Sequence, residues 1–199
     1  MKLPDGDVLI HCGDATGLGS LNEFVDFNRW MSEQPHKYKI FVAGNHDWLA
    51  YRDHGLATQI LQDVIYLRDS MVEIEGKKFY GSPWTPEFGN WAFMSPREKL
   101  AERWKLIPEK VDVLITHGPP HGILDGVVRW GEMEEMVENV GCEELRWEVL
   151  HRVKPRYHVF GHIHGGYGVK TLNDETVFMN VSCCDEDYDP VNPPKVFYL

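Results

Sequence analysis

The sequence predicts an α/β fold built on an open sheet of parallel strands. Two observations support this: four short apolar runs each end in a polar group, and helical patterns lie between them. At 199 residues, 43% hydrophobic and 26% charged, the chain has the length and composition of a single globular domain, residues 1–199. We therefore expect one domain in which the carboxyl ends of the strands meet along one edge.

Capping and turn signals mark the elements of the first half. The strand from about Val8 to Cys12 is almost wholly apolar, so we expect burial on both faces. Ser20 and Glu23 form a capping box that opens a helix to about Ser32, whose core face carries Leu21, Phe24, Val25, Asn28 and Met31. The elements predicted next are a strand over 38–43, a helix running into a strand over 56–67, and a hairpin over 71–80 that turns at Glu75-Gly76.

The second half alternates helices and strands in the same way. Ser95-Pro96-Arg97-Glu98 is interpreted as a second capping box, opening a helix to about Ile107. The acidic stretch 125–140 is interpreted as a loop, with Glu132, Glu134, Glu135 and Glu138 on a solvated face. The remaining predictions are a strand over 111–116, a helix over 142–153, a strand over 157–160, a hairpin over 169–181 turning at Asn173-Asp174, a solvated loop with Asp185, Asp187 and Asp189, and an edge strand over 195–198.

Polar groups directly follow four of these strands. They are Asp14, Asn45-His46-Asp47, His117 and the pair His162 and His164. Taken singly, three of these groups have a structural alternative: a turn at Asn45, a hydrogen-bonded histidine at His117, a pair of loop histidines at 162 and 164. Ligands collect outside the carboxyl ends of parallel strands, and these oxygen and nitrogen donors suit a divalent metal pair. Their agreement outweighs the single alternatives.

The same motifs carry a family resemblance. Gly13-Asp14, Gly44-Asn45-His46-Asp47, His117-Gly118 and Gly161-His162-Ile163-His164, in this order, resemble the calcineurin-like metallophosphoesterase superfamily. The segments Gly81-Ser82-Pro83-Trp84, His117-Gly118-Pro119-Pro120 and Gly165-Gly166-Tyr167-Gly168 further resemble the subfamily of metallophosphoesterase-domain proteins first noted in vertebrate brain, which has bacterial members. The resemblance implies a four-layer αββα sandwich. The superfamily strand ending in Asp-x-His has no counterpart before Val8, so we expect a shortened chain lacking its first strand.

The resemblance also implies roles for the polar groups. Asp14 would bridge two divalent ions, drawn from Mn²⁺, Fe²⁺ or Fe³⁺, Zn²⁺ and Mg²⁺, while Asn45, His117 and His162 would complete one site and His164 would belong to the other. A hydroxide between the ions would attack phosphorus. His46 would stabilise or protonate the leaving oxygen, and Asp47 would orient His46 or hold it protonated.

Two functions follow as expectations. The first is a metal-dependent phosphodiesterase or phosphomonoesterase acting on small esters such as nucleotides or cyclic nucleotides. The second is a weak or inactive module that binds one metal and a nucleotide, because without Asp-x-His only Asp14 and His164 remain for the second ion. We expect Trp48, Trp84 and His121 to wall the pocket. The aromatic side chains in the loop 81–93 would either wall this pocket or cap the core.

Charge and cysteine content limit the possible partners and the cellular compartment. A net charge of −11 disfavours a nucleic-acid polymer, but a small phosphorylated substrate fits because metal ions supply local positive charge. Four cysteines without paired spacing are interpreted as reduced thiols. The amino end lacks a signal-like segment and no apolar run is as long as a membrane span. We therefore expect a cytoplasmic protein with no membrane partner.

Overall fold

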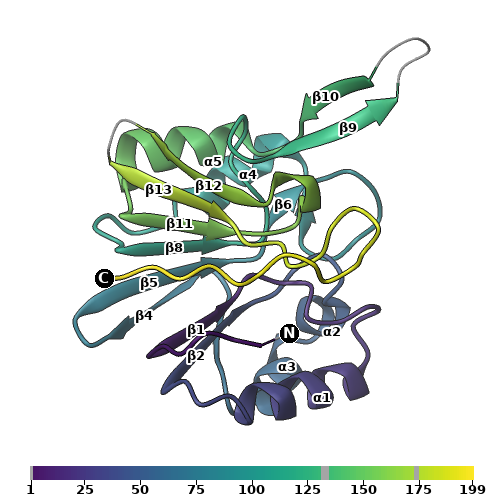
Figure 1. The fold of residues 1–199 in the computed structure, drawn as a ribbon, viewed down its shortest axis with the longest axis vertical. Coiled ribbons are helices and arrows are strands. Elements are labelled where there is room, and N and C mark those ends of the chain that lie inside the picture. Colours follow the sequence, from purple (N-terminus) through teal and green to yellow (C-terminus); the bar gives the residue numbers. More distant parts are fainter. Residues whose placement is uncertain (1, 131–134, 173–174) are drawn as a thin grey trace.

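Two β-sheets pack face to face with helices on their outer sides, so the chain forms an α/β sandwich (Figure 1). The computed structural model describes residues 2–130, 135–172 and 175–199. Strand residues such as Val42 and Phe79 meet in the apolar layer between the sheets, whereas their neighbours Phe41 and Tyr80 join the core under the helices. This alternation follows from the two-residue period of a strand. The predicted sandwich is confirmed.

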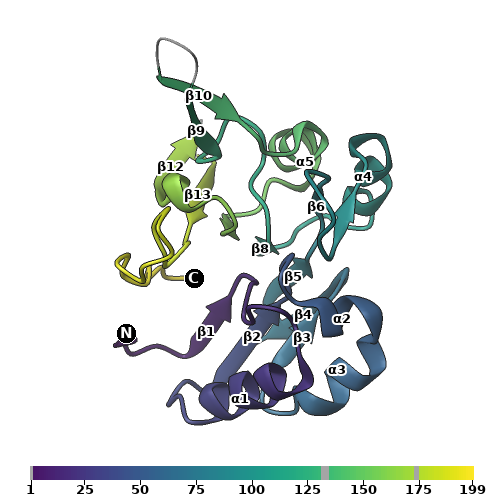
Figure 2. The ribbon, with the colours of Figure 1, turned by 90° about the vertical axis from the view of Figure 1, so that its right-hand side faces the viewer.

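The smaller sheet contains three parallel strands in the order β1-β2-β3. Its strands and the helices beside it are β1 (Val8–His11), β2 (Tyr38–Val42), β3 (Ile65–Leu67), α1 (Leu21–Ser32), α2 (Trp48–Arg52) and α3 (His54–Ile60). The three helices lie together on the outer side of this sheet (Figure 2). Among the described residues β1 pairs only with β2, and its side chains are half-buried, not buried on both faces as expected. The side chains of β1 are only half-buried because β1 lies at the edge of the described sheet.

The larger sheet has six strands in the order β12-β13-β11-β8-β5-β4. Its four central strands run parallel, and an antiparallel strand closes each edge. The strands and covering helices are β4 (Ser70–Ile74), β5 (Lys77–Ser82), β8 (Val113–Thr116), β11 (Tyr157–Phe160), β12 (Gly168–Leu172), β13 (Thr176–Asn180), α4 (Arg97–Trp104), α5 (Glu143–Glu148) and the π-helical turn Val149–Val153. The carboxyl ends of β8 and β11 therefore point the same way.

The capping box predicted at α1 is present. Ser20 Oγ accepts from the Glu23 backbone N–H, and the Glu23 carboxylate accepts from the Ser20 backbone N–H at 2.8 Å. The buried face carries Phe24, Phe27 and Met31, whereas Leu21 and Val25 are exposed, so the predicted core face was displaced. The helix ends at Ser32 as expected.

The acidic stretch 125–140 is an antiparallel hairpin, not the predicted loop. Its strands are β9 (Gly126–Trp130) and β10 (Glu135–Asn139), and the hairpin projects from the body of the sandwich (Figure 1). Buried Asp125 accepts from the backbone N–H groups of Gly122 and Gly141, which draws the two ends together. Glu138 pairs with Arg129 across the strands. Glu132 and Glu134 lie outside the described residues, as does the predicted turn at Asn173-Asp174.

Two smaller predictions were also wrong. Pro96, without a side-chain hydrogen bond, occupies the N-cap of α4, and Ser95 is in β7 (Met94–Ser95), which pairs with β6 (Thr85–Pro86). Residues 195–198 form no strand, because the tail packs through side chains: the Phe197 ring lies 4.4 Å from that of Tyr157. Within the described ranges, no helix combines the length and apolar composition needed to cross a membrane.

Candidate metal centre

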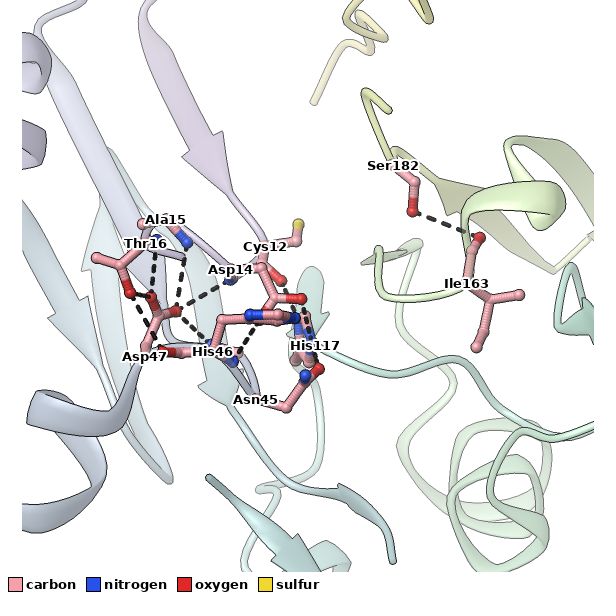
Figure 3. Close-up of polar contacts among 12 residues, drawn as sticks. Cys12, Asp14, Ala15, Thr16, Asn45, His46, Asp47, His117, Ile163 and Ser182 are labelled. Carbon is pink, nitrogen blue, oxygen red and sulfur yellow. Dashed lines mark hydrogen bonds and ion pairs between the residues drawn. The ribbon is translucent and has the colours of Figure 1, made fainter. Parts of the chain in front are cut away.

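Polar side chains from the carboxyl ends of four strands converge at one edge of the sandwich. Asp14 follows β1, Asn45 follows β2, His117 follows β8 and His162 follows β11. Ligand atoms of Asp14, His117 and His162 lie within 4.8 Å of one another. Figure 3 shows the part of this cluster around Asp14, Asn45 and His117. The fold thus brings together residues that lie far apart in the sequence.

His117 presents one ring nitrogen to two oxygens. Its Nδ1 donates to the Cys12 carbonyl at 2.8 Å, and because a carbonyl only accepts, Nδ1 carries hydrogen. Nε2 then faces Asn45 Oδ1 at 2.8 Å and Asp14 Oδ2 at 3.2 Å. Burial would lower the pKa of His117, but the Asp14 charge and hydrogen bond raise it above its ordinary value. The position therefore favours a cation, whether a proton on Nε2 or a metal ion beside it.

Asp14 and His162 have the charge states that metal ligands require. Burial would raise the pKa of Asp14, but His117 holds it below its ordinary value, so Asp14 is a carboxylate. Burial lowers the pKa of His162 to about 3, so its ring is neutral at physiological pH. Gly44 lies so close that a side chain there would overlap Asp14 Oδ1. Only glycine fits at that position.

Asp47 lies beneath the cluster and is fully buried. Its carboxylate accepts from the backbone N–H groups of Asp14 at 3.0 Å, Thr16 at 3.1 Å and Gly44 at 2.6 Å, and from the Thr16 hydroxyl at 2.8 Å. Burial and the negative charge of Asp14 raise the pKa of Asp47 to about 6, against these hydrogen bonds. Asp47 fastens the loop after β1 to the loop after β2 (Figure 3).

His46 is oriented by a different partner from the one expected. Its Nδ1 donates to the Gly17 carbonyl at 2.8 Å, and its ring lies 4.6 Å from that of Trp91. Its backbone N–H donates to Asp14 Oδ1 at 2.8 Å. The Asp47 carboxylate accepts hydrogen bonds from backbone N–H groups of the two loops and from the Thr16 hydroxyl, and not from the His46 ring. The orienting role proposed for Asp47 thus falls to Gly17 and Trp91 in this geometry.

His164 lies next to the cluster but is outside the group formed by Asp14, His117 and His162. Its Nδ1 donates to the Asp185 carbonyl at 2.7 Å, which leaves Nε2 as the ring nitrogen available to a ligand. The edge of its ring meets Tyr188, with centroids 5.0 Å apart. The structure therefore gathers four of the five expected ligands and places the fifth beside a separate loop.

The three residues expected to wall the pocket make other contacts. Trp84 is 7% exposed and donates through Nε1 to Asp69 at 2.8 Å, so it belongs to the core. Trp48 lies under the guanidinium of Arg52, 4.6 Å from its ring. The backbone of His121 pairs with Cys142. None of the three lines the pocket beside His162.

Two other aromatic side chains of the loop 81–93 stand beside the cluster. Phe88 lies 5.4 Å from the His162 ring, and Trp91 lies against His46. The sequence left open whether these rings wall a pocket or cap the core, because a loop has no periodicity that separates the two roles. The structure assigns Trp84 to the core and the other two to the site.

Comparison with known proteins shows which family this site belongs to. The family model for calcineurin-like phosphoesterases matches residues 2–166. The chain belongs to the calcineurin-like phosphoesterase family. This chain is 45% identical over its whole length to metallophosphoesterase domain-containing protein 1 of Homo sapiens and to that of Mus musculus. The chain spans 66% of the length of each of these relatives. A UPF0046 protein of Caenorhabditis elegans is 41% identical, covering 95% of this chain and 73% of its own.

A solved structure shares the fold of this chain at low sequence identity. It superposes with a TM-score of 0.65 and 17% identity, over 88% of this chain and 79% of the other. Members of the family usually bind divalent metals, and the donor set fits one: a charged carboxylate, an amide oxygen and two imidazoles around one point.

Proposed function

We propose that this chain is a metal-dependent phosphodiesterase or phosphomonoesterase that hydrolyses small phosphate esters, nucleotides and cyclic nucleotides among them. The observation that carries the proposal is Nε2 of His117 facing the oxygens of Asn45 and Asp14 beside a neutral His162. Family membership supports phosphate esters as the substrate class.

Asp14, Asn45, His117 and His162 would hold a metal ion, with Mn²⁺, Fe²⁺ or Fe³⁺, Zn²⁺ and Mg²⁺ as candidates. Such an ion stabilises negative charge on a phosphoryl group and lowers the pKa of water. Its ligands must be deprotonated, as the Asp14 carboxylate and the His162 ring already are. The proposal also retains a second ion near His164, as the family resemblance implies.

His46 is the proposed acid for the leaving oxygen. Since Nδ1 donates to the Gly17 carbonyl, Nε2 is the free ring nitrogen, and a proton there can be given to the departing group. Packing against Trp91 restricts rotation of the ring. Asp47 acts as a positioning residue, because it holds the loops that carry Asp14 and His46 in one arrangement.

The proposed substrate is a small molecule and not a nucleic-acid polymer. The net charge of −11 would repel a polyanion over any extended surface, while a single phosphate needs positive charge at the cluster only. We also propose the cytoplasm as the compartment, on the low cysteine content alone.

Hydrolysis of bis(p-nitrophenyl) phosphate tests the proposal. We expect turnover after loading with Mn²⁺ and its loss with a chelator. His46→Gln should lower kcat by about a hundredfold or more, because glutamine cannot donate a proton in the same way. His151→Gln, the same change at an exposed histidine of the π-helical turn, is the control and should leave kcat unchanged. Equal rates with and without chelator, or full activity of His46→Gln, would contradict the proposal.

The placement of His164 favours a second candidate, a module that binds one metal and a nucleotide without turnover. Among the described residues only Asp14, His117 and His162 form a group of acidic or histidine ligands close enough for one ion. Titration calorimetry separates the two functions: the module predicts one ion and a bound nucleotide that is recovered intact, whereas the enzyme predicts that a phosphodiester is consumed.

A further inference from the structure

A pocket of about 450 Å³ lies beside His162, and the proposed chemistry leaves part of its wall unused. Val127 and Val128 of β9 form one side. Glu186 and Tyr188, from the loop after β13, form another. The pocket is thus built from the turn that carries His162 and His164, both expected metal ligands, and from two segments that hold no expected ligand.

The loop that carries Tyr188 is fixed to the cluster by hydrogen bonds. The Asp185 carbonyl accepts from His164 Nδ1 at 2.7 Å and also from the Tyr188 backbone N–H at 3.1 Å. The Asp185 carboxylate accepts from the backbone N–H groups of Asp187 at 3.0 Å and Asp189 at 2.9 Å. This closed turn holds the Tyr188 ring against the edge of His164. The Asp185 carboxylate therefore shapes the loop, whereas Asp187 and Asp189 are exposed, as the sequence predicted.

The valine side is held in place as well. Asn180 Nδ2 donates to the carbonyls of Leu124 at 3.0 Å and Ile163 at 2.8 Å, which ties the start of β9 to the turn between His162 and His164. A side chain at Gly166 would overlap the Leu124 carbonyl, so glycine permits this approach. Ser182 also donates to the Ile163 carbonyl at 3.4 Å (Figure 3).

The chemistry of the walls favours a particular kind of group. The valines are apolar, and Tyr188 offers a ring that is 69% exposed. Glu186 adds a carboxylate, and no lysine or arginine is found among the described residues that line the pocket. A flat apolar group gains contact with the ring and the valines, whereas a negatively charged group meets Glu186 without a lysine or arginine to compensate its charge.

His46 follows β2 of the smaller sheet, whereas the pocket is lined by the turn after β11 and the loop after β13 of the larger sheet, and by β9. Resting on the proposed phosphoesterase function, we propose that this pocket binds the organic group that stays on phosphorus, and that Tyr188 and Glu186 select a flat uncharged group over a small alkyl or an anionic one.

Three p-nitrophenyl diesters with the same leaving group test the proposal. Their second groups are methyl, phenyl and 4-carboxyphenyl. We expect kcat/KM for the phenyl ester to exceed that for the methyl ester about tenfold, as a well-placed aromatic contact allows. Tyr188→Ala should remove most of this ratio and Tyr188→Phe should keep it. Glu186→Gln should raise kcat/KM for the carboxyphenyl ester several-fold relative to the phenyl ester.

The controls separate this pocket from other aromatic walls. Tyr198→Ala truncates an 81% exposed tyrosine of the carboxyl-terminal tail and should leave the phenyl-to-methyl ratio unchanged. An unchanged ratio in Tyr188→Ala would overturn the proposal. So would loss of the ratio in Phe88→Ala alone, since Phe88 borders His162 from another loop.

Binding of phenylphosphonate and methylphosphonate to the Mn²⁺-loaded protein gives a readout without turnover. A preference for phenylphosphonate that Tyr188→Ala removes would support the pocket even if no diester were hydrolysed, and in that case only the proposed catalytic function would fail. Equal affinity for the two phosphonates in the unaltered protein would overturn the pocket assignment whatever the rates show.

Discussion

The Asp47 carboxylate accepts a hydrogen bond from the Asp14 backbone N–H at 3.0 Å. Asp47 is not an expected metal ligand, but it holds the expected ligand Asp14 in position. The same carboxylate accepts from the Gly44 backbone N–H at 2.6 Å, on the loop that carries Asn45. Two strand ends are joined in this way. The position of the Asp14 carboxylate next to His117 depends on this junction.

Replacing Asp47 by alanine should destabilise the fold, because it leaves several buried N–H donors without an acceptor. We expect the free energy of unfolding of the metal-free protein to fall by about 2 to 4 kcal/mol. Urea denaturation with a chelator present measures it. Asp53→Ala, which removes an exposed N-cap of α3, is the control and should cost about 1 kcal/mol. Equal stabilities of Asp47→Ala and the unaltered protein would refute the junction.

Metal binding should release a proton, with a pH dependence set by His117. Below the raised pKa of His117 the metal-free protein carries a proton on Nε2, and an ion must displace it. Affinity therefore falls as pH drops below that pKa and levels off above it. His162, with its pKa lowered to about 3, adds no release near neutral pH. Calorimetry in buffers of different ionisation enthalpy should give about one proton per ion at low pH, declining as pH rises. Constant affinity across this range would count against His117 as a ligand.

Gly44→Ala should weaken the metal site more than the fold. The added methyl group would overlap Asp14 Oδ1 and crowd the His117 ring, so both must move. We expect Mn²⁺ affinity to fall between about 10-fold and 100-fold, the range seen when residues that position ligands are changed. Gly55→Ala in α3 has room for a methyl group and should leave Mn²⁺ affinity unaltered. Comparable affinities for the two variants would show that the close approach at Gly44 is unimportant.

Trp91 and Trp84 should behave differently when replaced. Trp91→Ala frees the His46 ring and should lower kcat about tenfold, with little change in stability. Trp84→Phe removes the hydrogen bond to Asp69 and should cost about 1 kcal/mol of stability, with KM unchanged. Steady-state kinetics and thermal unfolding, measured on the same samples, test both expectations. If Trp84→Phe instead raised KM without loss of stability, Trp84 would line the substrate pocket, as the sequence predicted.

The strand ends could be predicted from the sequence because each apolar run stops at a polar residue, and parallel strands bring such stops together. Asp14, Asn45 and His117 are of this kind. The relation between His46 and Gly17 could not be predicted in this way, because backbone carbonyls carry no sequence signal. The Ser20 capping box could be predicted because it needs a serine and a glutamate at a fixed spacing, whereas the one predicted at Ser95 failed because that residue pairs in β7.

The pocket wall was the least predictable part of the site. Acidic residues in 125–140 and 185–189 favoured solvated loops, yet Asp125 and Asp185 accept backbone hydrogen bonds that close the β9/β10 hairpin and the Tyr188 loop. A short acidic side chain has the same composition signal whether it faces water or a backbone N–H. Only the fold separates these two cases.

The number of metal ions per chain, measured by elemental mass spectrometry after loading with Mn²⁺ and removing free ion, tests the central claim most directly. We expect at least one ion per folded chain, and its loss in Asp14→Ala with the circular dichroism spectrum retained. A chain that binds no ion, or an Asp14→Ala variant that binds as many as the unaltered protein, would contradict a metal centre at Asp14, His117 and His162.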